Sequence, residues 1–302
     1  MNDKRGPALP PQSNNRAEGT IDNLSRRNFV YGLGAALLSG CGGGDGAATA
    51  ATTTQGTTGT TGTAGTTTSN TAASTQTFTH PGLLHTEADF GRMRAKVAAK
   101  ASPWIDGWNV LVANSHTSLS RNPNPQAAIY RGNDGVHAEN YAVLFNDAAA
   151  AYALALRWKI SGDDAYADKA IAILNAWANT LTLIGGSSDR FLASGIYGYE
   201  LANAAEILRT SPHWRPADFH RFQAMMVDVF YTMNHDFLTR HNGAKIDHYW
   251  ANWDLANMAS MLAIGVLADR RDIYAEAIDY FKHGQGNGAI EHVVWKLYPN
   301  GL

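Results

Sequence analysis

Apolar residues recur every three or four positions along most of the chain after residue 86, which is the spacing of one face of an α-helix. The pattern predicts a series of helices, with Thr86 as an N-cap and Pro216 as a first-turn proline. The predicted helices span residues 87–99, 146–160, 166–181, 196–208, 216–230, 255–267 and 273–283. Only residues 293–298 favour a short extended piece, so the fold class predicted is all-α.

The predicted helices come in pairs, and the pairs recur. Asp164-Ala165-Tyr166-Ala167 is repeated as Asp272-Ile273-Tyr274-Ala275, and each copy follows a helix rich in Ala and Leu. Another helical pair lies between them. Stacked hairpins of this kind form either an open solenoid or a closed toroid. Long aromatic-rich loops favour the toroid, so we predict an incomplete (α/α) toroid with its site at one end.

The N-terminal part, residues 1–41, is predicted to be an export signal. Arg26-Arg27 precedes an apolar stretch, Val30 to Leu38, in the pattern of a twin-arginine signal, and Leu38-Ser39-Gly40-Cys41 resembles a bacterial lipobox. The apolar stretch is too short to span a bilayer. Cys41 is the single cysteine of the chain, which fits lipidation and excludes an intramolecular disulfide. The sequence therefore predicts a periplasmic or outer-membrane lipoprotein.

Residues 42–78 are predicted to be a flexible linker, because Gly, Thr, Ala and Ser cannot bury enough surface to offset chain entropy. The folded domain is placed at 79–302. The net charge of -2 gives no basic field for nucleic acid. Because the apolar stretch before Cys41 is too short to span a bilayer, contact with a membrane is expected only through the lipid anchor.

The densest group of chemically active side chains is the run His248-Tyr249-Trp250-Ala251-Asn252-Trp253-Asp254. It combines an imidazole, a phenol, an amide, a carboxylate and two indoles. Indoles stack on sugar rings, and the polar groups can move protons or donate hydrogen bonds to a carboxylate. The run predicts a carbohydrate-active site at the entry to a helix.

Three segments together resemble the alginate-lyase-like polysaccharide lyases. Residues 80–93 (HPGLLHT, then FGRM) look like the opening of that family. Residues 248–258 (HYWANWDLANM) are similar to its central His/Tyr-Trp segment, and residues 195–206 (GIYGYELANAAE) look like the helix that precedes this segment. The resemblance covers residues 80–302. It implies an incomplete toroid of helix pairs, often with a C-terminal β-sandwich. It also implies cleavage of an anionic uronate polysaccharide, alginate or a related glucuronan, by β-elimination.

The chain departs from the family pattern at two points. More familiar alginate lyases carry Asn-Asn-His before the Tyr-Trp pair, whereas Ile246-Asp247-His248 displaces the histidine by one position. The family also places a catalytic Arg and Tyr beyond such a segment. The expectation is that the chain is truncated and lacks part of the site.

β-Elimination requires donors that neutralise the uronate carboxylate, a base, and an acid for the leaving oxygen. His248 is predicted as base or carboxylate donor, and Asn203 as neutraliser unless it makes a helix–helix hydrogen bond. Asn252 is the alternative donor for neutralising the uronate carboxylate. It lies four residues after His248, so a helix that already included residue 248 would place both side chains on the same face. Tyr249 is the local acid, with core packing as its alternative. The residues predicted to bind substrate are Trp250, Trp253, His137, Asn140, Tyr141 and Tyr199, with core packing the alternative for both indoles.

Two other functions stay open at this stage. A glycoside hydrolase would use two carboxylates across a cleft, drawn from Asp134, Asp247 and Asp254. A non-catalytic surface glycan-binding lipoprotein would need no catalytic group. His235 and His241 are predicted to lie in a solvated loop. The sequence holds no Cys pair and no His-Glu-x-x-His motif, so neither a metal nor a cofactor is predicted.

Overall fold

The computed structural model describes residues 77–294, which form helices and two short strands. The predicted export signal, with Cys41, and nearly all of the predicted linker lie outside the described residues. The helices are α2 (Glu87–Ala98), α3 (Trp104–Ala113), α4 (Ala142–Ser161), α5 (Asp164–Ala178), α6 (Asp189–Leu208), α7 (Pro216–Met225), α8 (Thr232–Arg240), α9 (Ala251–Leu267), α10 (Arg271–His283) and α11 (Ile290–Val293). The other elements are the strands β1 (Ala128–Arg131) and β2 (Leu183–Gly186), the 3-10 turns η1 (Ser115–Thr117) and η3 (His241–Gly243), and the π-helical stretch η2 (Met226–Tyr231).

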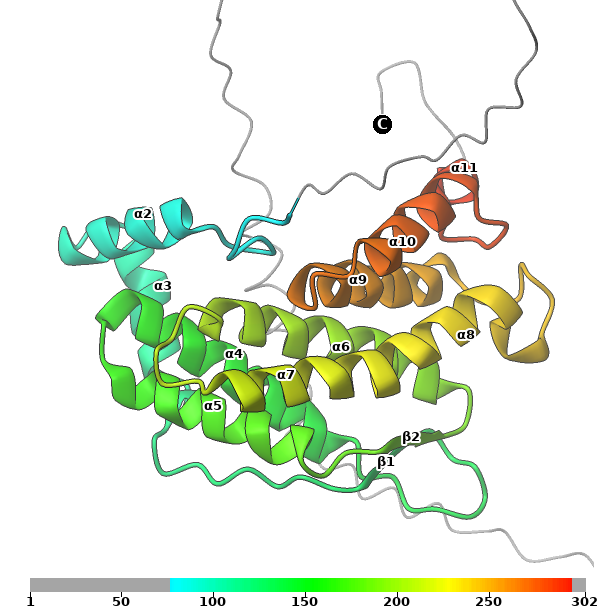
Figure 1. The fold of residues 1–302 in the computed structure, drawn as a ribbon, viewed down its shortest axis with the longest axis horizontal. Coiled ribbons are helices and arrows are strands. Elements are labelled where there is room, and N and C mark those ends of the chain that lie inside the picture. Colours follow the sequence, from blue (N-terminus) through cyan, green and yellow to red (C-terminus); the bar gives the residue numbers. More distant parts are fainter. Residues whose placement is uncertain (1–76, 295–302) are drawn as a thin grey trace, which may run out of the picture. The chain divides into compact units, whose positions relative to one another are not determined.

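Three long helices form the centre of the domain. α6 packs between α4 and α9, and all three run in the same direction (Figure 1). The chain returns after each one: α5 packs on α4, η2 and α8 pack along α6 while α7 packs on α5, and α10 packs on α9. The loops that precede α4, α6 and α9 therefore gather at one end, on the right in Figure 1.

The repeat predicted from the sequence is confirmed by these hairpins. Asp164–Ala167 opens α5 and Asp272–Ala275 lies in the first turns of α10, and each follows a central helix. The mostly helical fold is confirmed as well. Closure of the hairpins into a toroid stays a prediction.

The close packing of α6 on α9 depends on glycine. A Cβ added at Gly195 would lie 2.8 Å from the backbone carbon of Ala256, and one at Gly198 would lie 2.3 Å from Ser260 Oγ. Glycine inside a helix costs about 1 kcal/mol relative to alanine. Its presence here is explained by the space that a side chain would fill.

Local signals set several helix boundaries where the sequence placed them. Thr86 caps α2 in a capping box with Asp89, in which Asp89 N donates to Thr86 Oγ1 (3.3 Å) and Thr86 N donates to Asp89 Oδ2 (2.8 Å). Gly162 ends α4 with a φ of 74°, in the left-handed region that favours glycine. Pro216 opens α7, as predicted.

Other elements differ from the prediction. α3 was not predicted, although its apolar residues recur at helical spacing; its inward-facing side chains are half-buried and none is fully buried. The helical path beyond residue 230 continues through α8, whose buried side chains are Phe237, Leu238 and the polar Asn234. Asn234 donates to Ser194 Oγ (3.0 Å) and Asn257 Oδ1 (2.8 Å). β1 and β2 pair in parallel over only four residues each, too few for a clear alternation signal.

The segment before α2 is fastened to the C-terminal half of α6. His80 Nδ1 lies 2.5 Å from Glu206 Oε1, and its Nε2 lies 2.9 Å from Asp269 Oδ1. Gly82 N donates to the same Glu206 oxygen (3.0 Å). This segment therefore lies toward the end of α6 opposite the gathered loops.

Candidate active site

The run from His248 to Asp254 divides its side chains between solvent and core. His248 and Trp250 are exposed, with Trp250 at 81%, while Tyr249 between them is buried. α9 begins at Ala251 with Trp250 as its N-cap residue, so His248 stands in the loop before the helix. An imidazole and an indole are thus presented to solvent by one short segment.

Tyr249 and Trp253 belong to an aromatic cluster with Phe237 of α8. The Tyr249 ring centroid lies 4.6 Å from that of Trp253 and 5.1 Å from that of Phe237. The Tyr249 hydroxyl accepts a hydrogen bond from Asn242 Nδ2 (3.2 Å). Both side chains therefore anchor the loop, in agreement with the core-packing alternative for each.

The predicted pairing of Asn252 with His248 on one helix face is wrong. The helix begins only at Ala251, so the spacing of four residues does not place the two side chains together. Asn252 is exposed in the first turn of α9.

Asn203 is not at the start of a helix, because α6 already begins at Asp189. The side chain is buried, its Nδ2 donates to Tyr199 O (2.9 Å), and its Oδ1 accepts from Leu84 N (3.2 Å). The amide thus ties the segment before α2 to α6. The structure does not bring it to His248 and gives it a structural role.

The second predicted group lies at the start of α4. His137 is exposed and stacks on Tyr130, with ring centroids 4.0 Å apart and an angle of 8° between the planes. Hydrogen bonds from the backbone and ring of His137 hold the pKa of Asp134 well below its usual range. Asn140 bridges β1, accepting from Tyr130 N (2.7 Å) and donating to Ala128 O (3.0 Å). Of this group, His137 remains available to a ligand, whereas Asn140 is structural.

Arg131 is a residue that the sequence reasoning did not select. Its guanidinium lies 5.3 Å from the ring centroid of Tyr141 and 5.8 Å from that of Tyr197. Its Nη1 is buried and has no hydrogen-bond partner among the described residues. The guanidinium is half-buried and held by aromatic rings, and a cation of this kind is the type of group that binds carboxylates. Arg131 opens the turn-rich loop at 131–135, but a single arginine there carries no pattern that marks it.

Arg190 in the first turn of α6 connects these two groups. Its Nη1 donates to Gly186 O (3.2 Å), in the strand residue that pairs with Arg131. Its Nη2 donates to Asn242 Oδ1 (2.8 Å), and Asn242 in turn holds Tyr249. The loop with Arg131 and the loop with His248 are thus linked at the same end of the central helices.

Tyr199 and Glu200 lie farther along α6. Burial, together with the charge of Glu200, raises the pKa of Tyr199, and burial raises the pKa of Glu200 to about 8. Glu200 Oε2 is buried and has no hydrogen-bond partner within the described part of the chain. The carboxyl is therefore largely protonated at neutral pH.

His241 is buried, so the expectation of a solvated loop is wrong for it. Its Nε2 lies 3.1 Å from Asp254 Oδ1 and 3.1 Å from the Tyr280 hydroxyl, and Gly288 N donates to Asp254 Oδ2 (2.8 Å). His235 is a helical residue of α8 whose Nδ1 lies 2.5 Å from Glu276 Oε1. Asp254 is 1% exposed with both oxygens engaged, which removes it as one carboxylate of a hydrolase pair.

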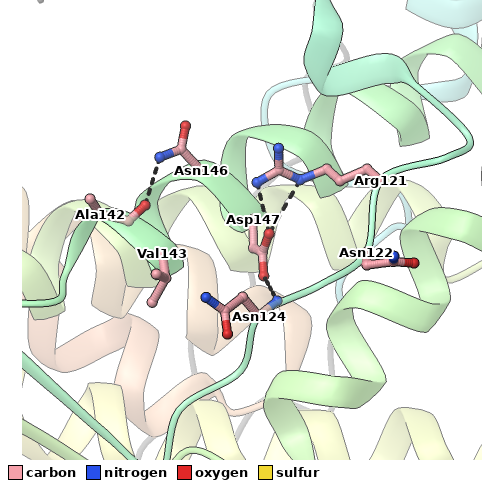
Figure 2. A pocket seen from close by; sticks show the side chains of 7 residues that line it. All are labelled: Arg121, Asn122, Asn124, Ala142, Val143, Asn146 and Asp147. Atoms are coloured by element: carbon pink, nitrogen blue, oxygen red, sulfur yellow. Dashed lines mark hydrogen bonds and ion pairs between the residues drawn. The ribbon is translucent and has the colours of Figure 1, made fainter.

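An open pocket of about 370 Å³ lies beside the first turns of α4 (Figure 2). Its floor is Asp147, which accepts from Arg121 Nη2 (2.9 Å), Asn124 N (2.8 Å) and Trp177 Nε1 (2.9 Å). This carboxylate holds the loop before β1 to α4 and α5. The pocket contains none of the predicted site residues.

Between residues 77 and 294, no group of three or more His, Cys, Asp and Glu side chains is arranged to hold a metal ion. None of the helices in the same range combines the length and apolarity that a membrane span needs.

The chain was compared with known proteins. The family model for alginate lyase matches residues 94–292. Among solved structures, alginate lyase A1-III from Sphingomonas species A1 is similar with a TM-score of 0.44 and 13% identity, over 64% of this chain and 57% of that enzyme. No curated protein sequence matches. Because the family match extends over more than half of the chain, this protein belongs to the alginate lyase family.

Proposed function

We propose that this protein is a polysaccharide lyase that cleaves a uronic-acid polymer, alginate or a related glucuronan, by β-elimination. Family membership supports the reaction class. The observation that carries the proposal is the presentation of His248 and Trp250 to solvent on either side of the buried Tyr249. The imidazole is the base or carboxylate donor, and the exposed indole is the surface on which a sugar ring stacks.

The surroundings of His248 suit an anionic polymer. α4, α6 and α9 all begin at this end of the domain, and the positive ends of their dipoles point the same way. Arg131 adds a half-buried cation. His137 and Tyr141 contribute polar and aromatic surface beside it.

Export and lipid attachment belong to the same proposal. Arg26-Arg27, the apolar stretch after them and Cys41 support secretion and anchoring at the cell surface, where a polysaccharide is accessible. A linker of the kind predicted from the sequence would let the domain reach a polymer away from the membrane.

A substrate screen tests the proposal. The purified chain is incubated with alginate, glucuronan and hyaluronan, and both ultraviolet absorbance of the new double bond and reducing ends are followed. The expected result is an absorbing product that His248→Ala abolishes without unfolding the domain. Arg131→Gln should weaken binding to the polymer, with exposed Arg92→Gln as the control. Reducing ends without absorbance would indicate a hydrolase, and binding without any product would indicate a glycan-binding protein; either result overturns the assignment.

A further inference from the structure

The segment that follows α10 passes directly against the loop that carries His248. Asn287 in this segment donates both hydrogens of its side-chain amide to that loop: Nδ2 lies 3.0 Å from Asp247 O and 2.7 Å from Tyr249 O. These two carbonyls belong to the residues on either side of His248. A single amide group therefore holds the backbone on both sides of His248 through two hydrogen bonds.

Glycines on both sides of Asn287 make this approach sterically accessible. A Cβ at Gly286 would lie 2.3 Å from Asp254 Oδ2 and 2.4 Å from the Tyr280 hydroxyl. A Cβ at Gly288 would lie 2.3 Å from Asp254 Cβ. Real side chains do not approach so closely, so only glycine fits at these two positions without movement of their neighbours.

The segment is itself held in place by buried partners. Gly288 N donates to Asp254 Oδ2 (2.8 Å), and His241 lies 3.1 Å from the other oxygen of the same carboxylate. His241 stands at the start of the loop and Asp254 in the first turn of α9 after it. The base of the loop and the segment that carries Asn287 thus share one buried anchor.

Apart from the packing of Tyr249 against Trp253 and Phe237 and its hydrogen bond from Asn242, the loop has few other restraints near His248. Its described backbone hydrogen bonds are Ala244 N to His241 O and His248 N to Lys245 O, each 3.0 Å. The side chains of Lys245, Asp247 and His248 are exposed. Without the amide of Asn287, the Asp247 and Tyr249 carbonyls would lose these hydrogen bonds, and the packing of Tyr249 would be the main restraint left on the backbone next to His248.

We propose that Asn287 is a positioning residue for His248, acting through its two hydrogen bonds to the Asp247 and Tyr249 carbonyls. The inference rests on the proposed role of His248 in β-elimination. Its physical basis is that catalysis is sensitive to small displacements of a reacting group, and a shift of about 1 Å can lower a rate roughly 100-fold. Asn287 need not touch substrate, so its effect should fall on kcat.

The main variants are Asn287→Ala and the isosteric Asn287→Asp, which places carboxylate oxygens against the two carbonyls. We expect each to lower kcat by roughly 10- to 100-fold with little change in KM. Asn175→Ala is the matched control: this half-buried amide accepts one hydrogen bond from Trp214 Nε1 (2.9 Å), far along the chain from the site. The control should lose a similar amount of stability against urea and keep its kcat.

A double-mutant cycle separates positioning from a general structural effect. Because His248→Ala is expected to abolish elimination, the cycle uses the residual rate of His248→Gln, which keeps a hydrogen-bonding side chain. If Asn287 acts through His248, Asn287→Ala should cause no further loss of rate in the His248→Gln background, because coupled residues are not additive. An additive loss, or a normal kcat in both Asn287 variants, would overturn the inference.

A second measurement does not depend on activity. Backbone amide NMR of Asn287→Ala should show exchange broadening confined to residues 245–250, with unchanged signals for the same residues in Asn175→Ala. An inactive wild-type protein would contradict the proposed function. Unchanged spectra in Asn287→Ala would contradict the inference that the two hydrogen bonds of Asn287 hold the loop.

Discussion

Glu200→Gln should stabilise the domain, and the gain should grow with pH. Glu200 lies in α6 with Oε2 buried and without a hydrogen-bond partner among the described residues. Burial without a partner disfavours the charged form, which raises the pKa of Glu200 from 4.5 to about 8. Glutamine has nearly the same shape and carries no charge at any pH.

The sign follows from the two pKa values. Below pH 4.5 the carboxyl is protonated in both the folded and the unfolded chain, so ionisation has no effect on stability. Between pH 4.5 and about pH 8 the unfolded chain ionises first, and the free energy of unfolding falls as pH rises. A tenfold change in proton affinity is worth about 1.4 kcal/mol, so the whole interval corresponds to at most roughly 5 kcal/mol.

Urea denaturation followed by tryptophan fluorescence, between pH 5 and pH 8, measures this effect. The difference in the free energy of unfolding between Glu200→Gln and wild type should be small at pH 5 and reach several kcal/mol at pH 8. Exposed Glu139→Gln is the control and should give a flat difference. A Glu200→Gln difference that does not change with pH would refute the reasoning.

Two further predictions concern the scaffold and the anchor. Asp147→Ala should lower the free energy of unfolding by about 3–5 kcal/mol, because it leaves Arg121 and the buried Trp177 Nε1 without their shared acceptor; thermal and urea unfolding measure the loss, and a change within about 1 kcal/mol would contradict the role given to Asp147. Cys41→Ser should move the protein from the membrane fraction to the soluble periplasmic fraction and abolish incorporation of labelled fatty acid; an unchanged distribution would exclude lipidation as the anchor.

Sequence periodicity alone was enough for the helices whose apolar stripe is continuous. The stretches that became α5, α9 and α10 were predicted close to their observed bounds, and the repeated Asp-x-Tyr-Ala signal identified matching helices. Thr86 and Pro216 marked helix starts because their effects are local. α8 was missed because its buried face includes Asn234, which is stable in the core only through partners on α6 and α9.

The candidate site likewise has features that the sequence revealed and features that only the structure revealed. The sequence identified His248 and Trp250, because an imidazole and indoles clustered before a helix are visible in one short segment. Only the tertiary structure decided that Trp250 faces solvent while Tyr249 and Trp253 pack against Phe237. Burial depends on which distant helix lies alongside, and a local pattern does not contain that information.

The sequence by itself thus determined the helical class and the repeat, and it predicts an export signal with a lipidation site and the segment that carries the chemistry. The tertiary structure decided which polar groups are left for a ligand and which are used internally. The polar groups of Asn203 and Asp254 are used in hydrogen bonds within the domain, whereas the imidazole of His248 is exposed to solvent. Asn287 reaches the carbonyls on either side of His248 from 38 to 40 residues away. A hydrogen bond depends on which groups are close together in the folded protein. The order of residues along the chain therefore does not reveal partners that only folding brings together.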